Sequence, residues 1–271
     1  MNAVAATLPV PARAKLGPFD LIEHVAEGSH GPVYRGIQRA SRMPVAIQFL
    51  SDPDLDRFDP ARISIASPTI LEVLATGIFA KVPYVVTPLA FGRTLLGPFD
   101  DRQRSPVEAA SIVASLAESV GLLHHHGIVH LRLSPRNIVL GDAAPILLDL
   151  GTSRHLRHGQ AECTRLPVDA TVAAPEQWLL GSRLTPATDV YQLGALLRLC
   201  WTGAAGGTES AISTRLLRHV PNSLRDVCAR ALATDVHRRF KDANQFAVAL
   251  RHAIGRGQTH TLVNWWRKLF N

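Results

Sequence analysis

The stretch 128–137 gathers five polar side chains between a helical segment and an apolar run. These are His130, Arg132, Ser134, Arg136 and Asn137. Arg132 cannot accept a proton, because a guanidinium has no acceptor atom and stays charged in proteins. The amide of Asn137 can tie down its own loop. This stretch, called the polar loop below, therefore has no proton acceptor at its centre.

In register over its whole length, the polar loop resembles the catalytic loop of protein kinases, H-R-D-L-x-x-x-N. His130 and Asn137 fall on the pattern. Arg132 stands where the family has its catalytic Asp, and Ser134 stands where protein Ser/Thr kinases usually have Lys. The chain thus resembles a kinase at the place where it lacks the residues of kinase chemistry.

An earlier segment resembles the glycine-rich loop of kinases, G-x-G-x-x-G-x-V. Gly28, Gly31 and Val33 match, whereas Ala26 replaces the first glycine and Pro32 removes a backbone donor near the loop. Such a loop works because backbone N–H groups approach phosphates closely. A plain β-hairpin with glycines in its turn explains the same residues.

The strand expected over 44–50 matches V-A-I-K, with Gln48 in place of the lysine that holds the α- and β-phosphates in the family. Gln48 can hydrogen-bond a phosphate but contributes no charge. The partner glutamate is also missing, since no Glu occurs between Glu27 and Glu72. Prolines and β-branched residues predict a stunted or absent helix over 54–66.

The resemblance also implies where an adenine ring would lie. Ala46, Val33 and Val139 match the positions that sandwich the ring, Thr87 matches the gatekeeper, and Leu89 lies in the segment that would line the adenine. The buried strands of any protein would show similar residues. The nucleotide-binding candidates are therefore Gly28, Gly31, Val33, Ala46, Thr87, Leu89 and Val139.

The segment 145–151 matches a kinase strand followed by the D-F-G motif, with Leu150 for Phe. In the family the aspartate at the position of Asp149 is the main Mg²⁺ ligand, and the asparagine at the position of Asn137 is the second. Both remain, so the resemblance implies weakened binding of ATP with Mg²⁺ or Mn²⁺. The structural alternative is that Asn137 anchors its loop and that residues 149–151 form a turn.

A second set of matches concerns residues that hold the kinase fold together. Glu176 of an A-P-E motif would pair with Arg239 of a motif resembling L-x-x-D-P-x-x-R-F. Asp189 of a motif resembling D-x-Y-S-L-G would hydrogen-bond the backbone of the polar loop. The structural candidates are thus His130, Glu176, Asp189 and Arg239.

The segment just before A-P-E is harder to align. Asp169 and Val172 occupy the positions where the family usually has a Thr and a Tyr. Thr171 takes the role of the Thr if the register shifts. Both alignments stay open.

For the elements that must position these residues, the resemblance implies an α+β protein with a two-lobed protein-kinase-like fold. The resemblance gives a small, mostly antiparallel β N-lobe with a reduced helix αC, and a larger, mostly α-helical C-lobe. Apolar spacing predicts helices over 106–127 and 242–254. We expect four parts: a flexible lead-in over 1–17, the N-lobe over 18–91, the C-lobe over 92–254 and a basic aromatic tail over 255–271.

Composition limits the classes of function. The formal charge is +7, but only four of the 29 basic residues are Lys, and the basic residues are spread without a nucleic-acid-binding motif, so we expect no nucleic-acid partner. Three scattered cysteines and the adjacent histidines 124–126 indicate neither a disulfide framework nor a metal site. No uninterrupted apolar run reaches the roughly 18 residues of a membrane helix, and the N-terminus does not resemble a secretory signal. We expect a cytoplasmic protein.

The retained and lost residues differ in kind. Fold-holding residues are kept, whereas Gln48, Arg132 and Ser134 replace residues of the chemistry. We therefore interpret the chain as a pseudokinase, a catalytically impaired domain with a regulatory or scaffold role that allows ATP binding.

Two other functions stay open. One is an unconventional active Ser/Thr protein kinase or nucleotidyl transferase that uses Asp149 and Asn137 with a divalent metal. The other is a nucleotide-free protein-interaction module. The expected partner is a protein, for example an active kinase or another signalling protein. The segment 260–271, with Trp265 and Trp266, suits a partner groove or a membrane interface, and packing on the domain's own surface is the simpler alternative.

Overall fold

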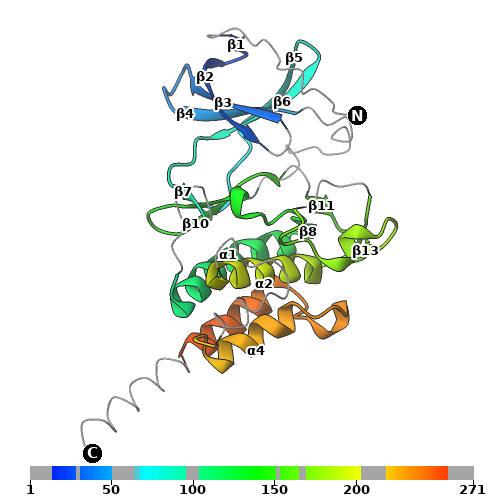
Figure 1. Ribbon diagram of the computed structural model, residues 1–271. Coiled ribbons are helices and arrows are strands. Elements are labelled where there is room, and N and C mark those ends of the chain that lie inside the picture. Colours follow the sequence, from blue (N-terminus) through cyan, green and yellow to red (C-terminus); the bar gives the residue numbers. More distant parts are fainter. Residues whose placement is uncertain are drawn as a thin grey trace, which may run out of the picture. The chain divides into compact units, whose positions relative to one another are not determined.

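The computed structural model describes residues 14–28, 31–50, 65, 67–95, 104–150, 153–164, 169–202 and 218–255. The chain forms two compact units, shown in Figure 1. Unit 1 comprises residues 1–66 and 71–90, and unit 2 comprises residues 67–70 and 91–271.

Unit 1 is built on an antiparallel sheet with the strand order β1-β2-β3-β4-β6-β5. Its strands are β1 (Lys15–Leu16), β2 (Phe19–Gly28), β3 (Gly31–Gln38), β4 (Pro44–Phe49), β5 (Ala75–Phe79) and β6 (Val82–Pro88). Successive side chains of a strand point to opposite faces. In β4, Val45, Ile47 and Phe49 are therefore fully buried, whereas Ala46 and Gln48 are half-buried on the other face.

Aromatic rings fill the buried side of this sheet. The rings of Tyr34, Phe79 and Tyr84 each lie within about 6 Å of the Phe49 ring, mostly edge to face. Leu16 and Phe19 are also buried in this core. The β-branched and aromatic residues of β2–β6 thus form a sheet because they bury one of its faces.

The lead-in is shorter than the sequence suggested. We expected residues 1–17 to be flexible, but Lys15–Leu16 form strand β1 and pair with Asp20 and Phe19 of β2. Leu16 is only 2% exposed, so burial of one apolar side chain explains why the sheet begins there. Residues 1–13 lie outside the described part of the chain.

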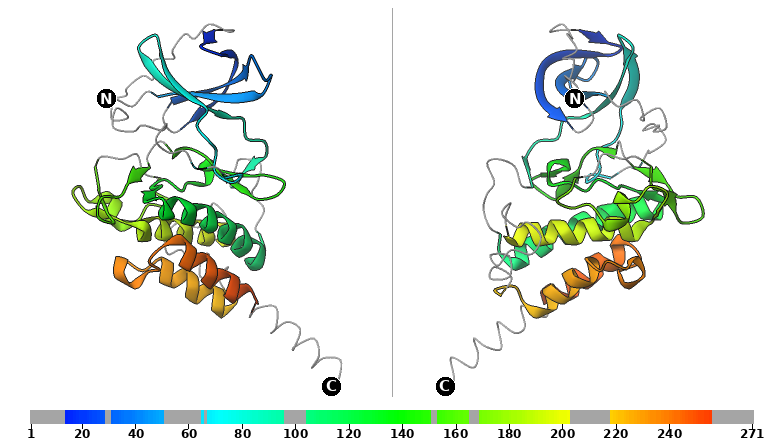
Figure 2. Two further views of the ribbon diagram at one scale, coloured as in Figure 1. Left: turned by 180° about the vertical axis from the view of Figure 1, so that it is seen from behind. Right: turned by 45° about the vertical axis from the view of Figure 1, so that its right-hand side comes forward.

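Unit 2 is mainly helical, as Figure 2 shows from two sides. Helix α1 (Pro106–His125) begins at Ser105, whose hydroxyl accepts a hydrogen bond from the Glu108 N–H group. Helix α2 (Pro186–Thr202) packs against α1 and against α4 (Asn222–Ala231), and a further helix spans residues 243–255. The helices predicted over 106–127 and 242–254 are thus confirmed within two residues at each end.

Short strands and turns connect these helices. The strands are β7 (Arg93–Thr94), β8 (Ile128–Val129), β9 (Ile138–Leu140), β10 (Pro145–Leu147), β11 (Arg154–His155), β12 (Ala161–Glu162) and β13 (Arg183–Leu184). Single 3₁₀ turns occur at η3 (Pro135–Asn137), η5 (Pro175–Trp178) and η6 (Val236–Arg238). The short strands pair as β10-β9-β7, β11-β8 and β12-β13. Along the chain, the polar loop runs from β8 through η3 to the start of β9.

Helix α1 is the described helix that is long and apolar enough to cross a membrane by length and composition alone. Glu108 and Glu118 interrupt its apolar sequence. Of its most apolar 18-residue window, 56% is buried inside the structure. A mostly buried core helix meets the same criteria of length and composition, so this feature alone is weak evidence for a membrane span.

Segment 67–70 differs from the expected lobe boundaries, because it belongs to unit 2. Thr69 accepts a hydrogen bond from the Leu147 N–H group at 2.8 Å, and its hydroxyl lies 2.7 Å from that of Ser119 on α1. Ile70 bridges to Leu147. The expected stunted helix over 54–66, apart from Ile65, and the tail after residue 255 lie outside the described residues.

Candidate functional site

The backbone of the polar loop is held by a carboxylate on helix α2. Asp189 is fully buried and accepts hydrogen bonds from the N–H groups of His130 and Leu131, each at 2.8 Å. Leu131 has a φ of 67°, a left-handed conformation that costs free energy for a residue with a side chain. The contact implied by the resemblance is present, and it stabilises a strained backbone.

The same carboxylate connects the polar loop to two helices. The Nε2 atom of His124, at the end of α1, lies 2.9 Å from Asp189, and its Nδ1 atom accepts a hydrogen bond from the Ala243 N–H group at 3.2 Å. Since Nδ1 accepts, Nε2 carries the proton and donates to Asp189. His124 thus has a structural contact that we did not predict, while His125 and His126 are exposed.

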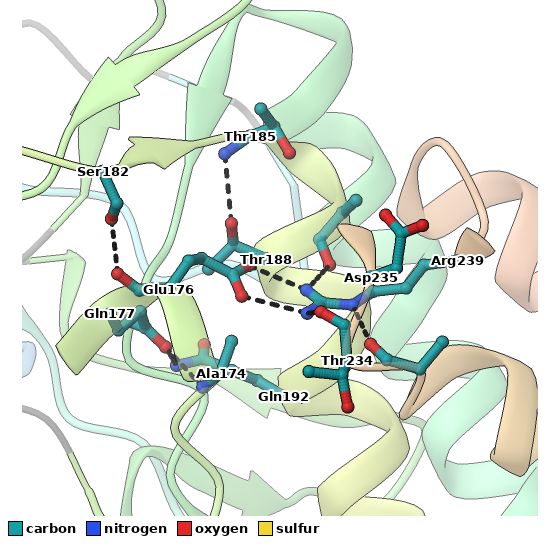
Figure 3. A network of polar contacts seen from close by, with 12 residues as sticks. Ala174, Glu176, Gln177, Ser182, Thr185, Thr188, Gln192, Thr234, Asp235 and Arg239 are labelled. Carbon is teal, nitrogen blue, oxygen red and sulfur yellow. Dashed lines mark hydrogen bonds and ion pairs between the residues drawn. The ribbon is translucent and has the colours of Figure 1, made fainter. Parts of the chain in front are cut away.

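Two buried glutamines, Gln177 and Gln192, also hold the loop; Figure 3 shows the two side chains beside Ala174. Gln177 and Gln192 both donate to the carbonyl oxygen of Leu131, at 2.8 and 3.1 Å. Gln192 also donates to Gln177 and accepts from the Leu133 N–H group, and Gln177 accepts from the Ala174 N–H group. The amide oxygen and nitrogen of both side chains are thus hydrogen-bonded, as buried amides require. Neither glutamine was predicted as a support, because both stand among other polar residues in the sequence.

A buried ion pair holds η5 against the helical part of unit 2 (Figure 3). Arg239 donates to both carboxylate oxygens of Glu176, at 2.7 and 2.9 Å, so the contact is bidentate. The Arg239 side chain is fully buried, and it also donates to the carbonyl oxygens of Ala187, Ala233 and Thr234. The pairing implied by the resemblance is therefore present.

His130 is fully buried inside the polar loop. Its Nδ1 atom accepts the Arg132 N–H group at 3.2 Å, so Nε2 is the protonated nitrogen and donates to the Leu148 carbonyl at 3.3 Å. Burial lowers the pKa of His130, although the charges of Asp189 and Asp149 oppose the shift. The imidazole is thus neutral at pH 7 and acts as a link between loop segments.

The two metal-ligand positions lie next to each other along paired backbone. The Asn137 carbonyl accepts the Leu148 N–H group at 2.8 Å, which places Asn137 beside the residue that precedes Asp149. The Asn137 side chain donates through Nδ2 to the Arg132 carbonyl at 3.1 Å, as its structural alternative requires. Asp149 has a φ of 58°. One carboxylate and one amide oxygen fit Mg²⁺, which prefers few protein ligands together with phosphates and water.

A further carboxylate contacts the loop from the segment before A-P-E. The hydroxyl of Ser134 donates to Asp169 at 2.7 Å. Thr171 donates to Asp169 through both its hydroxyl, at 2.6 Å, and its N–H group, at 3.1 Å, and is itself exposed. Asp169 therefore makes the contact to the polar loop, and Thr171 does not.

The other candidates lie on the sheet of unit 1. Val33 is paired with Gln48 across β3 and β4, and Ala46 is paired with Thr87 across β4 and β6. The Gln48 amide lies close to the hairpin end, because a Cβ atom at Gly28 would be 2.6 Å from its Nε2 atom. Gly31 has a φ of 136°, a conformation that favours glycine. Local backbone conformation and close packing thus explain why glycine stands at positions 28 and 31 of this hairpin.

Two nucleotide-binding candidates lie outside this group. Leu89 follows β6, and its N–H group donates to the Pro44 carbonyl at 3.2 Å within unit 1. Val139 is buried on β9 of unit 2, and a Cβ atom at Gly92 would be 2.7 Å from its side chain. Leu89 thus belongs to unit 1 and Val139 to unit 2. Their contact with a nucleotide stays a prediction.

Comparisons with known proteins agree with this arrangement. The sequence matches the protein kinase domain family over residues 19–245. It is 30% identical over 247 residues to the serine/threonine-protein kinase PknK of Mycobacterium tuberculosis, and 29% identical over 270 residues to the DNA damage-responsive serine/threonine-protein kinase RqkA of Deinococcus radiodurans. These matches cover 84% and 89% of this chain but 22% and 40% of the relatives, so the chain spans less than half of either protein.

Solved structures show the same fold. A crystal structure of the kinase domain of Mycobacterium tuberculosis PknI matches with a TM-score of 0.72 and 22% identity. The match covers 90% of this chain and 99% of that domain. The α+β fold with a β-rich N-lobe and a helical C-lobe, predicted from the motifs, is thereby confirmed.

Proposed function

Because the chain belongs to the protein kinase family, we propose that it is a catalytically impaired member, a pseudokinase with a regulatory or scaffolding role. The observation that carries this proposal is Arg132 at the centre of a loop whose supports are intact. Asp189 and the two buried glutamines hold the backbone, yet the central side chain cannot accept a proton. A decayed fold would be expected to lose these supports as well.

Magnitudes support impairment. A positioned general base contributes about 10²–10⁴ in rate, and a protein kinase typically turns over at about 1–100 s⁻¹. Gln48 in addition supplies no positive charge where the family has its phosphate-binding lysine. Loss of both groups leaves phosphoryl transfer too slow for ordinary signalling.

We further propose that the domain binds ATP with Mg²⁺ or Mn²⁺. The oxygen atoms of Asn137 and Asp149 would hold the metal, which supplies charge neutralisation for the phosphates. An unconventional active kinase or nucleotidyl transferase that uses the same two ligands is the alternative function, and a nucleotide-free interaction module is the second.

The proposed partner is a protein, such as an active kinase, met in the cytoplasm. One surface of unit 2 supports this role. Trp178, Leu179 and Leu180 follow one another and are 57%, 63% and 74% exposed. The Leu179 N–H group and the Ser182 hydroxyl both donate hydrogen bonds to the Glu176 carbonyl, and these bonds fix the turn that carries the three exposed side chains. Clustered exposed apolar residues are typical of interaction sites.

Thermal unfolding with and without ATP, in Mg²⁺, Mn²⁺ and EDTA, tests the nucleotide part of the proposal. A ligand at 100 times its Kd adds about 2.7 kcal/mol, which raises the midpoint measurably. We expect a metal-dependent rise that Asp149→Asn removes and that the exposed control Asp142→Asn keeps. The absence of any shift would instead favour the nucleotide-free module.

A further inference from the structure

A carboxylate lies within one hydrogen bond of the polar loop, although the loop itself has none at its centre. Asp169 accepts the Ser134 hydroxyl at 2.7 Å, and Ser134 in turn is tied to the central residue, because its N–H group donates to the Arg132 carbonyl at 2.8 Å. Asp169 is half-buried and thus within reach of solvent. The polar loop thus has Arg132 at the position of the family's catalytic aspartate, and the carboxylate of Asp169 lies beside it.

Other carboxylates that act on the loop are committed to other tasks. Asp189 is fully buried and accepts from two backbone N–H groups and His124. Asp149 is the metal-ligand position next to Asn137. Among the described residues that act on the loop, Asp169 is therefore the carboxylate suited to contact a substrate hydroxyl.

Asp169 has the capacity to accept one more proton donor. A carboxylate offers about four lone-pair positions on its two oxygens. Among the residues that the structure describes, three groups donate to Asp169: the Thr171 N–H and hydroxyl groups to Oδ1, and the Ser134 hydroxyl to Oδ2. The second position on Oδ2 can accept the hydroxyl of a serine or threonine substrate.

The ionisation state of Asp169 agrees with this use. Partial burial opposes ionisation, but the hydrogen bonds from Thr171 and Ser134 and the charge of Arg136 outweigh it, so the pKa of Asp169 is lowered. The group is a carboxylate at neutral pH. A lowered pKa also makes it a weak base, which limits the rate it can support.

We propose that Asp169 replaces the missing catalytic aspartate and gives the domain a slow, residual phosphoryl-transfer activity toward a protein hydroxyl. In this step the substrate O–H bond breaks and its proton moves to Asp169 Oδ2. The substrate oxygen forms a bond to the γ-phosphorus of a nucleoside triphosphate, and the bond from that phosphorus to the bridging oxygen breaks, releasing the diphosphate. Asp169 then returns the proton to solvent.

This activity is distinct from the regulatory role proposed above and rests only on the binding of a nucleotide. With this activity, the domain has lost most but not all of its catalytic rate. Removing a general base costs about 10²–10⁴ in rate, and a base of lowered pKa belongs at the low end of that range. We therefore expect Asp169→Asn to lower the residual turnover about 10²-fold.

The test measures phosphate transfer from ATP, with Mg²⁺ or Mn²⁺, to the chain itself and to a generic unstructured protein. The chain is used at a concentration far above that of any contaminating kinase. Wild type, Asp169→Asn, Ser134→Ala and the exposed control Asp142→Asn are compared at several pH values. Thermal unfolding with ATP runs in parallel. We expect Asp169→Asn to lose turnover and keep the ATP-dependent shift in midpoint, and Asp142→Asn to lose neither.

The Ser134→Ala variant separates a base from a structural anchor. It removes one hydrogen bond that lowers the pKa of Asp169, so the acid limb of the wild-type pH–rate profile should move to higher pH. A purely structural contact would instead lower the stability of both variants and leave the rate unchanged. That result overturns the inference, as does wild-type turnover that is absent or unaffected by Asp169→Asn.

The nucleotide measurement distinguishes this inference from the proposed function. ATP binding without Asp169-dependent turnover refutes the relocated base and leaves the pseudokinase standing. No ATP binding in any condition refutes both the relocated base and the nucleotide part of the proposed function.

Discussion

The supports of the polar loop and the side chains that the loop presents contrast sharply. The supports are buried and satisfied: Asp189, Gln177 and Gln192 contact backbone atoms of residues 130–133. The side chain that the loop presents at its centre, Arg132, is the wrong type for proton transfer. Because these three supports contact backbone atoms, none of their hydrogen bonds requires a particular side chain at position 132. Fold and chemistry are therefore separable in this domain.

Restoring the chemistry on the intact supports is the strongest way to sharpen this contrast. We expect Arg132→Asp combined with Gln48→Lys to raise phosphoryl transfer from ATP about 10²-fold or more, because the pair supplies a general base and a phosphate-binding charge. Arg132→Ala should bring no gain. If the double variant folds and binds ATP but stays at the wild-type rate, the loop is not held in a productive shape, and the separation of fold from chemistry is wrong.

Breaking a support has the next largest effect. Arg239→Ala leaves the Glu176 carboxylate buried without its bidentate partner, so we expect a loss of about 3–5 kcal/mol in the free energy of unfolding. The matched control is Arg251→Ala, which removes an exposed ion pair with Glu118 and should cost about 0–1 kcal/mol. Urea or thermal unfolding measures both. Equal losses in the two variants would show that the buried pair is no special support.

The smallest effect is a dependence of stability on pH through His130. Its pKa is lowered in the folded chain, so below the usual histidine value of about 6.5 the unfolded chain binds a proton that the folded chain excludes. We expect the stability to fall as pH drops from about 6.5, and His130→Asn to flatten that slope while exposed His125→Asn does not. Asp169 also has a lowered pKa, but its contribution is present above about pH 4 and is lost only below it, so it does not affect this range. An unchanged slope in His130→Asn would contradict the neutral buried imidazole.

Much of the fold followed from motifs and periodicity. The match to V-A-I-K predicts a strand over 44–50, and the structure has strand β4 there, with Val45, Ile47 and Phe49 buried. The Glu176–Arg239 pair and the contact of Asp189 with the loop followed from short motifs with fixed spacing. Such features are predictable because each is encoded within a few neighbouring residues.

Other features depend on segments far apart in the chain. Gln177 and Gln192 are 15 positions apart. Gln177 contacts Leu131 from 46 positions away, and Gln192 contacts it from 61 positions away. Nothing in the local pattern separates such an amide from an ordinary polar residue. Likewise, the contact with Ser134 is what makes Asp169 a candidate, since the sequence alone also allows Thr171 at that position after a shift of register.

The histidine at the end of α1 has a consequence for how the protein is made. His124 joins Asp189, which holds the loop, to Ala243, which lies 119 positions farther along the chain than His124. A ribosome releases the chain from its N-terminus onward, so the polar loop emerges well before either of these partners. Leu131 can adopt its strained backbone stably only after α2 has emerged, and the imidazole gains its last partner later still. The loop at the centre of the proposed site is thus completed only after the chain has been synthesised as far as residue 243, when most of the domain is already available to pack around it.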